Sequence, residues 1–388
     1  MNTVFGFKSS KSSAFTDVDS NAWYGPQAAA ALEAGFMSGY PDGSFKPQAV
    51  ITRQEAAKAV AGLFHVPSAG EQVLDNYRDQ ADVQSYARAS LASLLSAGYL
   101  KGYADGSLQP SKAITRAEAV TLLDRLAGEV LNTHGTATLG ETAGSVLINT
   151  TGVRLKDTVI NGNILLTAGI GEGDAWLEKV TVKKAVYVGG GGPNSIHIAD
   201  SRIQSLVGDH PKSKVRVVIS GDSEIQNASV GSNMLLELDQ NAKIDSLVVE
   251  EESEAAAITA KGTIGSLKVL SASVLINDSR IEKGAELAVK DGVVMKADGT
   301  PLKPQGSSSS VYVSGGGSLS IPPQLTPAAS GNIAGSSIAI TFPDNAPGAE
   351  QSAALRRAAR QSLRATTRSR PVLSLCMHRY LKERVTMR

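Results

Sequence analysis

Two arginines stand 63 residues apart in the same short phrase, Ile-Thr-Arg-x-Glu, at residues 51–55 and 114–118. In each copy the threonine and the glutamate, three residues apart, have the spacing of a capping box, in which both side chains satisfy free amides at a helix start. Capping does not explain Arg53 and Arg116, because a positive charge in the first helical turn opposes the helix dipole. An arginine beside exposed amides is suited to bind a carboxylate or a phosphate.

The sequence around each arginine recurs as well. AGFMSGYPDGSFKP (34–47) is echoed by AGYLKGYADGSLQP (97–110), and FTDVDSNAW (15–23) by YRDQADVQSY (77–86). A unit of about 60 residues is therefore present twice. Each unit is predicted to fold as a helix, a turn and a second helix.

The turn signals have physical causes. Pro26 is suited to a first helical turn, and Gly35 and Gly98 to the left-handed position that ends a helix. Pro-Asp-Gly at 41–43 predicts a tight turn, because proline presets one φ and glycine tolerates a positive one. Trp23 and Tyr86, at matching positions, are candidates either for stacking on a sugar ring or for burial as helix anchors.

This combination of motifs resembles the S-layer homology (SLH) repeat, over roughly residues 14–128. The resemblance implies α-helical repeats in a helix-turn-helix bundle. It also implies non-covalent anchoring to the secondary cell-wall polysaccharide of bacteria, which is often pyruvylated in this family, and hence an extracellular location at the cell wall or S-layer. By the same resemblance the carbohydrate-binding residues are Asp17, Trp23, Asp42, Gly43 and Arg53 in the first unit, and Asp79, Tyr86, Asp105, Gly106 and Arg116 in the second.

The domain limits follow from the repeats. We assign residues 14–74 and 75–138 to the two units. SLH repeats usually come in threes, and VFGF at 4–7 is similar to the end of a unit, so we interpret residues 1–13 as the remnant of a preceding repeat. A start codon placed too late, or a truncated gene, would explain both this remnant and the missing signal peptide.

A second, shorter repeat occupies residues 139–300. Apolar residues alternate in segments broken by Gly, Asn or Asp, as expected of short strands. The anchor residues of successive copies are 17 to 22 apart; they are Ile160, Val182, Ile203, Ile225, Ile244, Ile264 and Ile281. This period predicts an all-β, parallel β-helix-like region. A β-sandwich is the rival, and the lack of two-residue hairpin turns argues against it.

The coil is predicted to be a scaffold or adhesion region without enzymatic activity, cofactor or metal. Its acidic residues are scattered, and the densest group, at 250–254, is typical of a solvated loop. The glycines at 189–192 precede Pro-Asn rather than a helix, so they are not a phosphate loop. The alternative from another class is a wall-anchored polysaccharide-degrading enzyme with its site on the coil.

Charge and composition divide the rest of the chain. Residues 351–388 hold nine arginines and one lysine against one acid, whereas the remainder has a net charge of −8. Residues 301–325 are predicted to be a Pro/Gly/Ser linker and 326–346 the start of an Ig-like β domain. The single cysteine, Cys376, excludes a disulfide framework, and no apolar run is long enough for a membrane span.

The arginine-rich tail, residues 347–388, is interpreted as a reading-frame artefact. Arginine, alanine and serine codons shifted by one frame encode Thr-, Gly- and Val-rich sequence, which would continue the β pattern that precedes the tail. Taken as it stands, the tail predicts a basic amphipathic helix for a nucleic acid or a membrane surface. We expect neither of these partners for the native protein.

Overall fold

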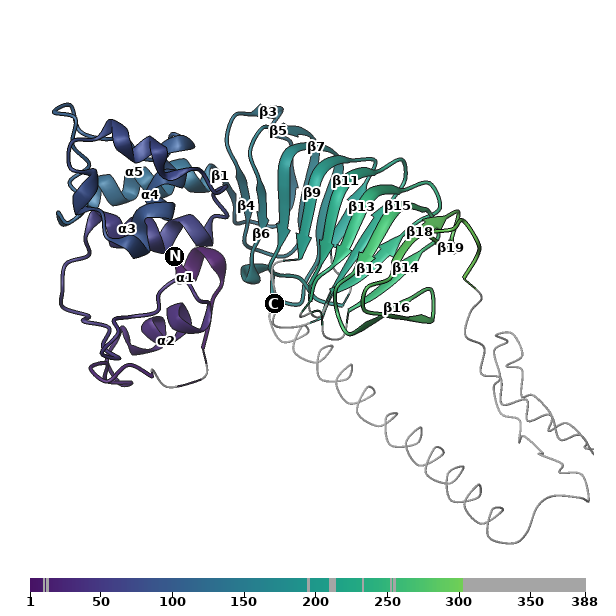
Figure 1. Ribbon diagram of the computed structural model, residues 1–388, viewed down its shortest axis with the longest axis horizontal. Helices are drawn as coiled ribbons and strands as arrows, with labels where there is room; N and C mark the ends of the chain where they lie inside the picture. Colours follow the sequence, from purple (N-terminus) through teal and green to yellow (C-terminus); the bar gives the residue numbers. More distant parts are fainter. Residues whose placement is uncertain are drawn as a thin grey trace, which may run out of the picture. The chain divides into compact units, whose positions relative to one another are not determined.

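The structure is a computed structural model that describes residues 1–302, except 10, 12–13, 194–195, 209–213, 232–233, 252 and 254–255. A helical N-terminal region precedes a β-solenoid of about seven turns (Figure 1). The described residues belong to one compact unit, Met1–Ser310. The expected Ig-like start and the arginine-rich tail lie outside the described residues, as does all but the beginning of the expected linker.

The helical region is built from short helices. They are α1 (Asn2–Phe5), α2 (Gly25–Glu33), α3 (Arg53–Leu63), α4 (Ser85–Ser96) and α5 (Arg116–Ala127), with 3₁₀ turns at Glu71–Asn76 and Gln80–Asp82. Pro26 lies in the first turn of α2, and Gly35 and Gly98 follow α2 and α4 with φ of 78° and 76°. The predicted helix boundaries are confirmed at these positions.

Helices pack across the repeat boundaries. Helix α3 of the first unit packs on α4 of the second, and α1 packs on α2. The side-chain amide of Asn2 donates to the backbone carbonyl of Gln27 at 2.8 Å. Phe5 meets Phe64 edge to face, with 5.1 Å between the ring centroids. The second helix of one unit thus lies against the first helix of the next.

The solenoid begins at Glu129, ahead of residue 139, where strands were expected. Its strands are β1 (Glu129–Leu131), β2 (Gly135–Ala137), β3 (Glu141–Thr142), β4 (Val146–Ile148), β5 (Val153–Ile160), β6 (Ile164–Leu166), β7 (Ala175–Val188), β8 (Ile196–Ala199), β9 (Arg202–Gly208), β10 (Val215–Ser220), β11 (Glu224–Val230), β12 (Met234–Leu238), β13 (Lys243–Val249), β14 (Ala257–Ala260), β15 (Thr263–Val269), β16 (Ser273–Ile276), β17 (Ser279–Glu282), β18 (Glu286–Lys290) and β19 (Val293–Lys296), with a 3₁₀ turn at Ala168–Ile170.

Parallel pairing joins successive turns of the coil. One series of pairs joins β4, β6, β7, β9, β11, β13 and β15, and another joins β5, β7, β8, β10, β12, β14 and β16 (Figure 1). The long strand β7 bends at Lys179, so its first part pairs with β8 and its later part with β9. The predicted anchors are direct register partners from Ile160 through Val182 and on to Ile264. These six anchors are at most 2% exposed, and Ile281, the seventh, is 4% exposed. The predicted parallel β-helix is confirmed, and the sandwich is excluded for this region.

One corner of the coil has a left-handed backbone in four successive turns. Asp157, Lys179, Asp200 and Gly221 occupy successive copies of this corner with φ between 47° and 60°. Aspartate and glycine adopt this conformation more readily than other residues. Beside the corner, buried serine hydroxyls bond the backbone of the neighbouring turn, so the bend leaves few buried polar groups without a partner.

The last predicted copy departs from the parallel pattern. Ile281 pairs antiparallel with Val274 in a β16–β17 hairpin, and β18 pairs antiparallel with β15 and β19. These strands close the C-terminal end of the coil, where a parallel strand would have left unpaired amides and carbonyls.

Candidate functional site

Both Ile-Thr-Arg-x-Glu phrases form the predicted capping boxes. At the start of α3 the Thr52 hydroxyl accepts from the Glu55 amide at 3.3 Å, and the Glu55 carboxylate accepts from the Thr52 amide at 2.6 Å. At the start of α5 the corresponding distances between Thr115 and Glu118 are 3.2 and 2.9 Å. The helix starts are therefore fixed by local sequence in both units.

A tyrosine from each turn joins the capping glutamate. Tyr40 donates its hydroxyl proton to Glu55 at 2.8 Å, and Tyr103 donates to Glu118. The bond to the Glu55 carboxylate raises the pKa of Tyr40 to about 12. The bond from Tyr103 and those from Thr115 lower the pKa of Glu118 to about 2. Both carboxylates are therefore charged at neutral pH.

Two of the predicted binding aspartates hold the turns in place. Asp17 accepts the backbone amides of Phe45 and Lys46 at 2.7 and 2.8 Å. Asp79 does the same for Leu108 and Gln109, both at 2.8 Å. The Phe45 bond is the largest cause of the lowered pKa of Asp17. Each aspartate ties the start of its unit to the segment that follows the turn.

Asp42 and Asp105 shape the turns themselves. Asp42 accepts the amide and hydroxyl of Ser44 at 3.0 and 2.6 Å, and Asp105 binds Ser107 with the same two distances. These bonds from Ser44 and Ser107 lower the pKa of each aspartate. The following glycines, Gly43 and Gly106, have φ of 79° and 77°, which a β-carbon would strain. This short-range pattern was visible in the sequence.

The two arginines have different environments. Arg53 is 5% exposed and crosses into the second unit, where it donates to the Lys101 carbonyl at 2.5 Å and lies 3.5 Å from Glu118. Its guanidinium stands 4.8 Å from the centre of the Tyr103 ring. Arg116 is exposed, and its side chain has no ion pair or hydrogen bond within the described part of the chain.

The Arg53 contact forms a seam between the two units. Its Nε is buried and has no hydrogen-bond partner among the described residues. The backbone adds to the seam, because Ile114 donates to the Ile51 carbonyl at 3.1 Å and Arg53 to the Lys112 carbonyl at 2.9 Å. The Lys112 ammonium also stands 4.9 Å from the Tyr103 ring. An unsatisfied guanidinium donor with the Lys112 ammonium nearby favours an anionic or hydroxyl-bearing ligand at this seam.

The two candidate stacking aromatics are both on the surface. Trp23 is 88% exposed and Tyr86 is 49% exposed, so neither is a buried helix anchor. Trp23 meets the Tyr24 ring edge to face, with 5.6 Å between the ring centroids. Tyr86, at the start of α4, lies beside the first capping box; partial burial and the charge of Glu55 raise its pKa. Exposed aromatic faces beside polar groups are suited to sugar rings.

Sequence reasoning missed the role of the two tyrosines. Tyr40 and Tyr103 recur in the Gly-Tyr-x-Asp-Gly turn, and this recurrence was the available signal. Their partnership with the capping glutamates needs the turn and the helix start to be adjacent in space, which only the fold shows.

The described residues of the solenoid present no comparable cluster. Within the described residues, no three His, Cys, Asp or Glu side chains are placed to hold a metal ion. Arg154, Trp176 and His197 stack on one another along the outer face of the coil, with 5.5 Å between the two ring centroids. Because each flat face meets the next, this stack leaves little ring surface for a sugar. Glu178 beside it pairs with Arg154 and with Lys156.

Comparison with known proteins points to one family for the helical units. Residues 14–57 and 76–120 match the S-layer homology domain. These are SLH repeats. The two matched segments are the ones that carry the turns, the capping boxes and the two arginines.

The similar proteins are surface proteins of bacteria. The SLH region is 40% identical over 99 residues to "Cell surface glycoprotein 1" of Acetivibrio thermocellus. It is 32% identical over 112 residues to "Cellulosome-anchoring protein" of the same organism, and 32% identical over 114 residues to "Surface-layer 125 kDa protein" of Lysinibacillus sphaericus. These matches span 25–29% of this chain and 4%, 25% and 10% of the three relatives. No solved structure gives a significant match.

A membrane-crossing helix is not found in the described part of the chain: none of its helices is both long and apolar enough.

Proposed function

We propose that the two SLH repeats anchor this chain to the secondary cell-wall polysaccharide of a bacterial surface, and that the solenoid serves as a scaffold or adhesion region. The observation that carries the proposal is the repeated site. In each of the two segments that match the SLH domain, a tyrosine of the glycine turn donates to the capping glutamate, and an arginine is the first residue of the helix that this glutamate caps. The relative described as cellulosome-anchoring shares this region of the chain.

The ten predicted residues divide into two roles within this proposal. Trp23, Tyr86 and Arg116 are exposed and would meet the glycan directly, while Arg53 would offer its unpaired Nε at the seam. The remaining six, Asp17, Asp42, Gly43, Asp79, Asp105 and Gly106, would act by holding the turns. An acidic substituent, such as a pyruvate ketal, would pair with guanidinium while the sugar ring stacks on an aromatic face.

Co-sedimentation with cell-wall sacculi tests the proposal. We expect the full chain to sediment with native sacculi and to stay in solution once their accessory polysaccharide has been stripped chemically. Replacing Trp23 or Tyr86 with alanine should weaken binding by roughly 5- to 100-fold, because each removes about 1–3 kcal/mol of stacking and burial. Both side chains are exposed, so the fold should survive.

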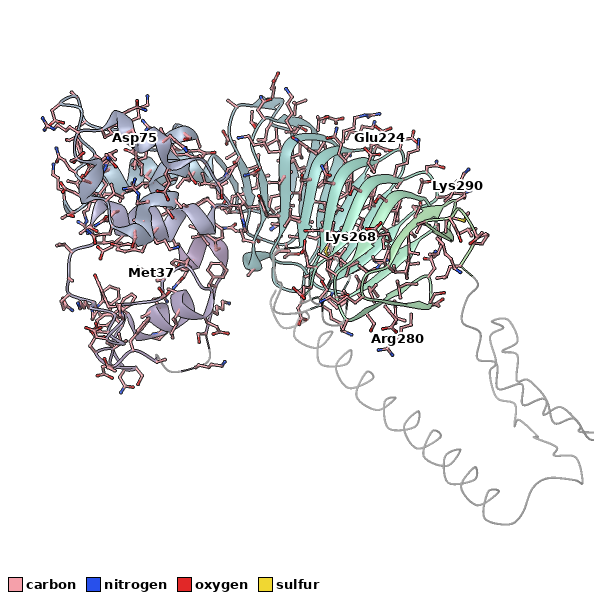
Figure 2. The ribbon with its side chains drawn as sticks, in the orientation of Figure 1. Met37, Asp75, Glu224, Lys268, Arg280 and Lys290 are labelled. Atoms are coloured by element: carbon pink, nitrogen blue, oxygen red, sulfur yellow. The ribbon has the colours of Figure 1, made fainter. Side chains whose placement is uncertain are left out.

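The matched control is Lys290→Ala, an exposed substitution on β18 of the solenoid (Figure 2). Equal binding to native and stripped sacculi would contradict the proposed ligand. Release of reducing ends or unsaturated sugars from acidic polysaccharides by the same preparation would favour the enzyme alternative. A catalytic acid or base on the coil would be a carboxylate without ion pairs. Glu178 does not meet this condition, because it pairs with Arg154 and Lys156.

A further inference from the structure

Helix α4 begins without a cap of its own. The first amides of a helix have no partner inside it, and a side chain at the helix start commonly accepts from one of them. The N-cap residue of α4 is Gln84, whose side chain makes no capping bond. Helices α3 and α5, in contrast, each begin with a complete capping box. An acceptor for the start of α4 therefore has to come from another part of the chain.

Gln54 of the first unit supplies this acceptor. Its side-chain oxygen accepts the backbone amide of Gln84 at 3.0 Å. In a capping box the same bond comes from the third residue of the helix itself. Here it crosses from α3 to α4, which pack on each other (Figure 1). Gln54 is 4% exposed, and its own amide donates to the Pro110 carbonyl at 3.0 Å, so the capping side chain is held at its base.

The capping side chain has no counterpart in the second unit. The variable position of Ile-Thr-Arg-x-Glu holds Gln54 in the first copy and Ala117 in the second. Along the chain, the next helix after the first copy is α4, which needs a cap, whereas the second copy leads directly into β1 of the coil. Alanine has no acceptor, and a strand has no helix start to cap. The two otherwise matching phrases therefore differ according to the element that follows them.

The bond that Gln54 makes lies close to a proposed glycan contact. Tyr86 is the second residue of α4, in the turn that begins at the capped amide. Its neighbour Ala87 is fully buried, whereas Tyr86 is 49% exposed. The charge of Glu55 acts on the Tyr86 hydroxyl, which places this ring beside the first unit. A displacement of the first turn of α4 would therefore move the exposed ring relative to the first unit.

We propose that Gln54 is a positioning residue for glycan binding, because it caps α4 from the first unit and so fixes the orientation of Tyr86. The stacking surface of the second unit is then held by a side chain of the first. Gln54 acts through Tyr86 and does not touch the glycan. The inference rests on the proposed function, since it assigns Gln54 a part in the same glycan site.

Amide hydrogen exchange at Gln84, measured on the full chain, tests the cap without any glycan. Gln54→Leu nearly keeps the side-chain volume but removes the acceptor, so exchange at Gln84 should become at least about threefold faster. Gln54→Glu keeps an acceptor, and a carboxylate is favoured at a helix start, so its exchange should stay within about twofold of the wild type. Gln226→Leu, the same substitution at an exposed position of β11, is the matched control.

Co-sedimentation of the full chain with sacculi tests the positioning. Gln54→Leu should weaken binding by roughly 3- to 10-fold, whereas Gln54→Glu and Gln226→Leu should bind like the wild type. In a Tyr86→Ala background Gln54→Leu should have no further effect, because the ring that Gln54 orients is already absent. In a Trp23→Ala background it should keep its full effect. A side chain that only stabilised the fold would weaken binding equally in both backgrounds.

Three results overturn the inference: unchanged exchange at Gln84 in Gln54→Leu, faster exchange with unchanged glycan binding, or an equal loss of binding in the two backgrounds. If Gln54→Leu fails to fold, Gln54→Ala, the change that copies the second unit, takes its place in every comparison. A wild-type chain that does not sediment with sacculi overturns the proposed function, and the exchange at Gln84 then decides the cap by itself.

Discussion

The helical and the solenoid regions both consist of repeats, but they use repetition in opposite ways. In the solenoid, successive copies pair in register and their anchors are buried to the same degree, so each copy has the same surroundings. In the helical region, two copies with the same motif differ sharply, with Arg53 buried in a seam and Arg116 on the surface. A repeat in a stack is defined by its neighbours on both sides, and in short arrays those neighbours differ.

The largest effect is expected from the solenoid core. Leu206 and Leu247 are fully buried in the same column of the coil. Replacing either with alanine should cost about 2–5 kcal/mol, because the coil cannot fill the cavity. If the copies are equivalent, the two costs should differ by less than about 2 kcal/mol, the spread found between unrelated buried sites.

The probe must report on the coil alone, since a chain with several regions does not unfold in one step. Trp176 lies on β7 and provides that signal in a Trp23→Phe background, during unfolding in denaturant. Lys243→Ala, an exposed change in the same turn as Leu247, is the control and should stay within about 0.5 kcal/mol. If the two leucine substitutions lowered the stability of the coil by amounts that differ several-fold, the turns of the coil would not be equivalent.

A smaller effect is expected from the two arginines. Arg53→Ala should destabilise the helical region by about 2 kcal/mol, because it removes hydrogen bonds from a charged donor and leaves Glu118 without its cation. Arg116→Ala, on the surface, should change stability by less than about 0.5 kcal/mol. Ellipticity at the helix band in urea measures both, at a protein concentration where the chain is monomeric. Equal losses of stability in the two variants would show that burial in the seam gives Arg53 no larger structural role than Arg116.

The smallest effect is expected in how the stability of the helical region depends on acidic pH. The pKa of Glu118 is about 2 in the folded chain, below its usual value of 4.5. Because the unfolded state takes up the proton first, the stability that this carboxylate contributes is complete above about pH 4.5 and is lost as the pH falls towards 2. Glu55, whose pKa is also lowered despite the opposing effect of burial, contributes in the same direction.

Helix content followed between pH 6 and pH 2, compared between the wild type and Glu118→Gln, isolates this contribution. The variant should be less stable at neutral pH and should depend less on pH across the acid range. A variant curve parallel to that of the wild type would mean that Glu118 is not charged in the seam.

Much of the fold could be predicted where the signal is local. Capping boxes, left-handed glycines and the anchor period each depend on a few neighbouring residues, and the structure confirms them at Thr52, Gly35 and Ile203. The burial of Arg53 could not be predicted, because the same phrase at Arg116 leads to exposure. Only the contact between units decides which arginine is covered.

The end of the coil shows the same limit. Ile281 fits the anchor period, yet it pairs with Val274 in a hairpin. Periodicity describes how a copy meets its neighbour, and the last copy has no further neighbour. The closing strands therefore pair antiparallel, whereas the turns before them pair in parallel.

The closed end also bears on how such a coil changes in length over evolution. Beyond β15, antiparallel strands cover the last turn, so a turn added there would have to replace them. A turn duplicated between β9 and β15 would meet neighbours with the same pairing register on both sides. Gene duplications inside the coil are therefore tolerated, and they lengthen the spacer without altering either terminus of the solenoid.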